Sequence, residues 1–131
     1  MSEQPDPDAV DLAHRLFDLA RAGDDSLLSY VGAGVPADLT DTSGNTLLML
    51  AAYHGHSAVV AGLAKLGADV DGLNDRGQSP LAGAVFKGET DVVRALVEAG
   101  ADADAGHPTA RETARFFERD DLAALLPQAR G

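Results

Sequence analysis

A repeat of 33 residues constrains the fold of this chain more than any other feature of its sequence. Segment 46–60 aligns with segment 79–93, and the same offset takes Leu63 to Leu96. The agreement includes Gly, Ala and Val positions that chance would rarely match together. Sequence periods of about 20 to 50 residues are typical of arrays in which each unit stacks on its neighbours. The repeat therefore predicts a stacked array rather than a single compact globule.

Two further copies extend the array at both ends. Thr109 matches Ser79 at an offset of 30, so three residues are missing from the turn before Thr109. Segment 20–24 matches segment 52–56 at an offset of 32 and indicates a degenerate first copy. The 131 residues thus hold about four units. We expect a disordered acidic N-terminus over 1–7, one repeat domain over 8–127 with units at about 8–39, 40–73, 74–106 and 107–127, and a tail over 128–131.

Each unit has the sequence signals of two short helices and a turn. Ser79 is a good N-cap, because its hydroxyl can accept a hydrogen bond from the first helical turn. Pro80 follows at the first helical position, where its missing N–H costs nothing. Gly88 suits the left-handed residue that ends the first helix, and Gly100 ends the second. Helices of about ten residues are unstable alone, so each unit must bury its apolar stripe against its neighbours.

Composition excludes several classes of function. The formal net charge is −11 and the chain has only two Lys, which argues against binding to nucleic acid or to anionic membranes. The absence of Cys removes disulfides, thiol nucleophiles and the usual structural zinc sites. Neither a signal peptide nor a long apolar run is evident. We therefore expect a soluble, cytoplasmic monomer without cofactor or metal.

The best-formed copy resembles an ankyrin repeat. Segment 74–102 reproduces the family's Gly-x-Thr-Pro-Leu, Val-Val and Gly-Ala-Asp motifs as GQSPL, VV and GAD. The resemblance covers nearly the whole chain and implies an all-α fold, an ankyrin-repeat solenoid of paired antiparallel helices with short hairpin-like turns. One departure is that Met49 and Ala82 replace the family's His, so a hydrogen bond that bridges the turn is expected to be missing.

The resemblance also implies a function and a site. Ankyrin-like solenoids are protein-binding scaffolds that use the concave face of their first helices and the tips of their turns. The chain is therefore expected to bind a partner protein and to have no catalytic activity. Mapped by position, the fingertip residues are Thr42, Ser43, Asn45, Asp75, Arg76 and Gln78. The predicted partner-binding residues are Tyr53, His54, Arg76, Gln78, Phe86, Lys87, Phe116 and Phe117.

Aromatic residues fall at these concave positions more than elsewhere. Tyr53, Phe86 and Phe116 align with one another across three units, and Phe117 follows directly. These are four of the six aromatic residues in the chain. Aligned positions form a row in a solenoid, and aromatic side chains are enriched at binding hot spots. The row is either a binding ladder in the groove or packing between adjacent first helices, and the sequence leaves both interpretations open.

Other patterns carry weaker signals. His54 and His56 could hold a metal only with further ligands, so a turn or capping role is the preferred interpretation. Stacked carboxylates at the bases of the turns could bind a cation weakly, but acceptance of backbone hydrogen bonds is commoner. An alternative function is an acidic inhibitor that sequesters a basic protein, and its association rate would fall steeply with added salt. The stacked carboxylates are Asp69, Asp71, Asp102 and Asp104.

Overall fold

The computed structural model describes residues 7–128 and shows, within them, eight helices that pair into four units. Residues 1–6 and 129–131 lie outside the described part, and so do most of the expected disordered N-terminus and of the expected tail. An isolated bridge joins Thr40 to Thr46, and no strand forms in the described residues. The helices are α1 (Pro7–Ala22), α2 (Ser26–Gly32), α3 (Leu47–Tyr53), α4 (Ser57–Lys65), α5 (Pro80–Lys87), α6 (Thr90–Glu98), α7 (Ala110–Phe116) and α8 (Asp120–Ala123).

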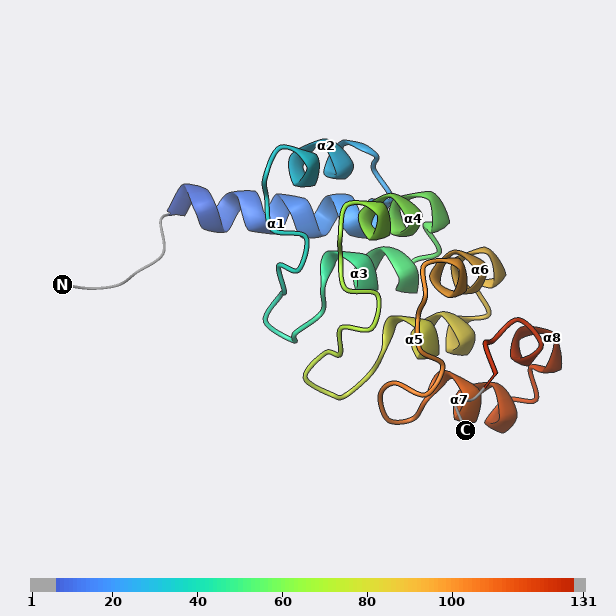
Figure 1. The fold of residues 1–131 in the computed structure, drawn as a ribbon. Helices are drawn as coiled ribbons and strands as arrows, with labels where there is room; N and C mark the ends of the chain where they lie inside the picture. The colour runs from blue at the N-terminus through green and yellow to red at the C-terminus, as the bar shows by residue number, and fades with distance from the viewer. Residues whose placement is uncertain (1–6, 129–131) are drawn as a thin grey trace.

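The units stack side by side into an all-α solenoid, as predicted. Helices α3, α5 and α7 follow one another in one row, and α4, α6 and α8 follow in a second row (Figure 1). The long α1 and the short α2 begin the two rows, and the turns between units project together from one side of the stack (Figure 1). The solenoid therefore presents a continuous surface made of first helices and projecting turns.

The first helices begin and end as the sequence predicted. The backbone N–H of Ala82 donates to Ser79 Oγ at 3.1 Å, and the N–H of Met49 donates to Thr46 Oγ1 at 3.0 Å. Gly88 ends α5 in the left-handed conformation with φ of 73°. These local hydrogen bonds satisfy N–H groups that a helix cannot satisfy itself. They form where the family's His is absent, so each of these helices still has a capped start.

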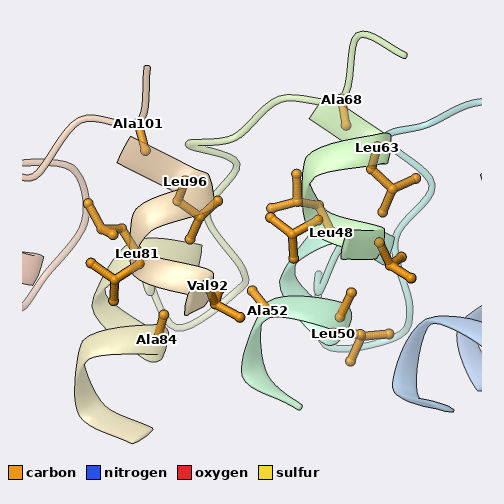
Figure 2. Close-up of a cluster of buried hydrophobic side chains, with 14 of the residues drawn as sticks. Leu48, Leu50, Ala52, Leu63, Ala68, Leu81, Ala84, Val92, Leu96 and Ala101 are labelled. Carbon is orange, nitrogen blue, oxygen red and sulfur yellow. The ribbon is translucent and has the colours of Figure 1, made fainter. Parts of the chain in front are cut away.

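The core repeats with the same period as the sequence. Leu48 and Leu63 of the second unit are fully buried, and so are Leu81 and Leu96 in the next unit. Figure 2 shows these side chains between the helices of the two neighbouring units. A fully buried Leu contributes about 1.5–3 kcal/mol relative to an exposed one. Each helix packs both against the other helix of its unit and against the neighbouring units, so part of this contribution depends on the neighbours and makes the stack cooperative.

The last unit is shorter and more polar than the others. Helix α8 has four residues, which is well below the expected length of about ten. Arg111 replaces the buried Leu81 of the preceding unit and forms an ion pair with Asp104 at 3.0 Å. Arg111 also donates to the carbonyl oxygen of Pro127 at 2.6 Å. The end of the stack is therefore covered by polar contacts, as expected of a terminal unit.

Candidate partner-binding groove

The aromatic row is exposed. Tyr53, Phe86 and Phe116 stand at or next to the C-terminal ends of α3, α5 and α7, and their exposed fractions are 43%, 50% and 80%. Phe117 follows at 45%. Rings that served only to pack between adjacent helices would be largely buried, whereas each of these keeps a large accessible face. The row is therefore apolar surface that water covers in the isolated chain.

Staggered contacts between successive units connect the aromatic row. The ammonium nitrogen of Lys87 lies 4.8 Å from the centre of the Tyr53 ring, within range of a cation–π interaction. Phe117 meets Phe86 edge to face with ring centres 5.4 Å apart, and it meets Phe116 at 4.9 Å. Each ring thus contacts the side chain one position further along in the next unit. Phe116 lies in the last unit that the structure describes and has no such neighbour there, which explains its greater exposure.

The fingertip turns are held in fixed shapes by side-chain hydrogen bonds. Asn74 Oδ1 accepts from the backbone N–H groups of Arg76 and Gln78, both at 3.0 Å. Asp41, which is 33 residues earlier, accepts from Ser43 and Asn45 in the same way, both at 2.9 Å. Turns of this kind are typical of Asn and Asp, whose side chains mimic a backbone turn. The fingertips are therefore preorganised.

Neighbouring fingertips are also joined to each other. The Asn74 amide donates to the Asn45 side-chain oxygen at 3.0 Å. The backbone N–H of Asp75 donates to the carbonyl oxygen of Ser43 at 3.0 Å. In the same way, the backbone N–H of His107 donates to the carbonyl oxygen of Gly77 at 2.9 Å. These contacts cross from one unit to the next, so the projecting turns form one connected edge rather than separate loops.

The first helices and the fingertips enclose a groove of about 1370 Å³. Seven of the eight predicted binding residues line it, and Lys87 instead lies over the Tyr53 ring. The sequence prediction omitted Arg115, which also lines the groove. Arg115 aligns with the buried Val85 of the preceding unit, and this replacement of an apolar residue by Arg is the signal that could have identified it. The seven residues are Tyr53, His54, Arg76, Gln78, Phe86, Phe116 and Phe117.

Two of the three acidic groups that line the groove are engaged in hydrogen bonds, Asp41 in a turn and Glu112 at a helix start. Partial burial would raise the pKa of Asp41, but hydrogen bonds from Asn45 and Ser43 outweigh it and hold that pKa below 3.8. Backbone and side-chain hydrogen bonds with Thr109 lower the pKa of Glu112 below its ordinary 4.5. These hydrogen bonds favour the charged form of each carboxyl group. Both carboxylates therefore serve the fold first.

The repeats of this chain match a known family of repeat proteins. The family model for ankyrin repeats matches residues 16–107 as three copies, which is well over half of the chain. The chain belongs to the ankyrin repeat family. Ankyrin repeats generally mediate interactions between proteins, and as a family they are non-enzymatic interaction domains. In the described residues no helix is both long and apolar enough to cross a membrane.

A curated relative supports the same assignment. A protein of Pseudomonas aeruginosa that is named as an ankyrin repeat protein, PA3287, is 41% identical over 65 residues. The match covers 46% of this chain and 38% of the relative, so this chain spans well under half of the relative's length. The similarity therefore concerns the ankyrin repeats themselves, and the array is similar to bacterial members of the family.

His56, which follows the end of the first helix, joins two ankyrin units. His56 Nε2 donates to the carbonyl oxygen of Arg21 in the preceding unit at 2.7 Å, which agrees with the structural role predicted for it. Burial lowers the pKa of His54 below 6.5, and the nearby His56, Lys87 and Arg21 lower it further. Among residues 7–128, no cluster of three or more His, Asp or Glu side chains could hold a metal ion.

The stacked carboxylates at the turn bases accept backbone hydrogen bonds, as the preferred interpretation predicted. Asp71 Oδ1 accepts from the N–H of Asp102 in the next unit at 2.8 Å. Asp69 and Asp102 each accept from the residue two positions ahead, at 2.9 Å. The bonds within the turns repeat with the ankyrin period, and the bond between Asp102 and Asp71 ties two successive units together.

Proposed function

We propose that this ankyrin array binds a partner protein through its concave groove and fingertip turns, with Tyr53, Phe86 and Phe116 as the central contacts. The observation that carries the proposal is the position of exposed apolar side chains. Six large hydrophobic residues of the described chain are exposed, and four of them line this one groove. Apolar surface gathered in a concave site is typical of an interaction surface, whereas single exposed residues need no explanation.

The fixed shape of the groove supports the same proposal. Fingertips that are already ordered lose little conformational entropy when a partner binds, which favours affinity. Arg76 and Gln78 lie in a turn that Asn74 holds in place, so their side chains extend from a rigid base. Aromatic rings and Arg are also the residues most enriched at binding hot spots.

A triple variant, Tyr53→Ala with Phe86→Ala and Phe116→Ala, tests the proposal. The wild-type chain and the variant are immobilised, and proteins retained from a lysate of the source organism are quantified by mass spectrometry. We expect the variant to retain the specific partner at least about tenfold less, because hot-spot aromatics each contribute about 2 kcal/mol or more.

Leu66→Ala with Leu73→Ala is the matched control. These two residues are exposed to 44% and 47%, but neither lines the groove. The control should retain the partner as well as the wild-type chain does. Circular dichroism establishes that all three proteins are folded. A folded triple variant that retains the same partner as the wild type would show that the groove is not the binding surface.

A further inference from the structure

We infer that the groove accepts an acidic segment of a partner protein, with one large apolar or aromatic side chain in that segment covering Phe116. This inference rests on the groove being the binding surface, as proposed above, and it adds the chemistry of the bound segment. Two independent observations carry it: the distribution of charge between the groove and the rest of the chain, and the open end of the aromatic row.

Positive charge is concentrated at the groove of an otherwise acidic protein. Of the residues that the structure describes, four Lys and Arg residues line the groove or contact its aromatic row, but only three Asp and Glu residues do so. The excess of negative charge in the net −11 therefore lies outside the groove. The four cations are Arg21, Arg76, Lys87 and Arg115, and the three carboxylates are Asp41, Asp75 and Glu112.

Two of the groove's cations, Arg76 and Arg115, form no ion pair in the described residues, whereas two of its carboxylates are engaged in hydrogen bonds. Asp41 is bound within its turn and Glu112 within the start of α7. In the described part of the chain, ion pairs join only Arg21 to Asp18 and Arg111 to Asp104. Arg76 and Arg115 therefore have no carboxylate at ion-pair distance. Guanidinium groups bind carboxylates in a bidentate geometry, so an acidic segment matches them.

The aromatic row shows where an apolar side chain fits. Lys87 covers Tyr53 and Phe117 covers Phe86, but within residues 7–128 no further unit supplies a side chain for Phe116. Phe116 is 80% exposed. Arg115, which directly precedes it in the sequence, also lines the groove. A partner residue on Phe116 would occupy the position that the next unit takes elsewhere. An aromatic or large aliphatic side chain would bury the most surface there.

Both elements of the segment are needed because the chain as a whole repels acidic proteins. A net charge of −11 disfavours the approach of a uniformly acidic partner. Burial of an apolar side chain on Phe116 supplies affinity that does not depend on charge. The guanidinium groups then favour carboxylates over ammonium groups on either side of that anchor. A basic segment would instead meet Arg76 and Arg115 as like charges.

Selection from a random library of displayed 12-residue peptides tests the inference on the full chain. We expect the peptides enriched by the wild-type chain to be net negative and to contain at least one aromatic or large aliphatic residue. Synthetic versions of the enriched peptides are then titrated by fluorescence anisotropy. The double variant Arg76→Glu with Arg115→Glu should bind them about tenfold more weakly or worse.

The matched control is Lys65→Glu with Arg94→Glu, which changes net charge equally at exposed residues outside the groove. It should bind the peptides within about twofold of wild type, since distant exposed charges are largely screened. Groove-dependent peptides that are neutral or basic, or that bind both double variants equally, would overturn the inference and leave the proposed function standing. If no enriched peptide loses binding to the Tyr53→Ala, Phe86→Ala, Phe116→Ala variant, the proposed function fails as well.

Discussion

The third unit and the last unit share the sequence pattern of the repeat but are stabilised differently. The third unit lies between two neighbours, and its Leu81 and Val85 are fully buried. The last unit has one neighbour, and the aligned residues are Arg111 and Arg115. Its first helix gains a capping box between Thr109 and Glu112, and its second helix shrinks to a single turn. Inner units are thus stabilised by apolar contact between units, and the end unit by local polar contacts.

The end unit also exposes side chains whose equivalents in the third unit lie beside a neighbour. Within residues 7–128 no unit follows the one that holds Phe116 and Arg115, so both stay exposed, whereas the equivalent residues Phe86 and Val85 have the next unit beside them. The end of the array combines a rigid backbone with an uncovered ring and an uncovered guanidinium. The end unit therefore differs from the inner units both in what stabilises it and in the side chains that it exposes. Two pairs of substitutions at aligned positions and one comparison of pH dependence test the contrast.

The largest effect is expected from truncating the aligned residues Leu81 and Arg111. Leu81→Ala should lower the free energy of unfolding by about 2–5 kcal/mol, because it removes a fully buried side chain between units. Arg111→Ala removes a partly exposed ion pair and should cost about 1 kcal/mol or less. Urea denaturation of the two variants measures both values. Equal losses would contradict the distinction between inner and end units.

A smaller effect is expected at the left-handed positions after the first helices. Gly88 has φ of 73°, and a Cβ there would come within 3.0 Å of an Arg119 guanidinium nitrogen. Gly88→Ala should therefore destabilise the fold by about 1–2 kcal/mol. Glu118 is the aligned residue of the last unit and has φ of 54° despite its side chain. Glu118→Gly should be neutral or stabilising by up to about 1 kcal/mol.

Thermal unfolding measures the melting temperatures of Gly88→Ala, Glu118→Gly and wild type, and so compares the two positions. A third variant, Glu118→Ala, keeps the strained backbone but removes the carboxylate, so it isolates the contribution of glycine. If Glu118→Gly lowers the melting temperature as much as Gly88→Ala does, the two positions do not share a common conformational requirement.

The sequence was sufficient for features that depend on local chemistry. The caps at Thr46 and Ser79, the left-handed Gly88 and the period of the buried leucines all follow from residue types at fixed spacing. The alignment of Tyr53 with Phe86 also placed both on one face of the stack. These features could be predicted because each unit repeats the same local geometry.

Features that depend on the stagger between units could not be predicted. The sequence placed Lys87 beside Phe86, but the structure places its ammonium group over Tyr53 of the preceding unit. Glu118 was not recognised as a left-handed residue, because Gly normally marks that conformation. The hydrogen bond that the Arg119 guanidinium donates to the Phe86 carbonyl oxygen, at 3.3 Å, also crosses between units. Such contacts require the relative shift of adjacent helices, which residue spacing does not contain.

The smallest and most specific effect concerns pH. Hydrogen bonds with Thr109 lower the pKa of Glu112 below 4.5, so its contribution to stability is present above about pH 4.5 and is lost as the pH falls through the lowered pKa. The corresponding residue of the third unit is Ala82, which does not titrate. Glu112→Gln keeps a capping-box side chain without the titration. Its free energy of unfolding should therefore fall less steeply than that of wild type between about pH 5 and pH 3.

Urea denaturation at half-unit pH intervals measures this difference. The other carboxylates that lose stabilisation in the same range, such as Asp41, are present in both proteins and cancel in the difference. Glu98→Gln is the control, because Glu98 is an exposed carboxylate at the end of α6 and accepts no capping hydrogen bond there. It controls for the replacement of one exposed Glu by Gln. If Glu112→Gln runs parallel to wild type, the capping box does not stabilise the end unit through its charge, and the polar stabilisation of that unit must come chiefly from Arg111 and its partners.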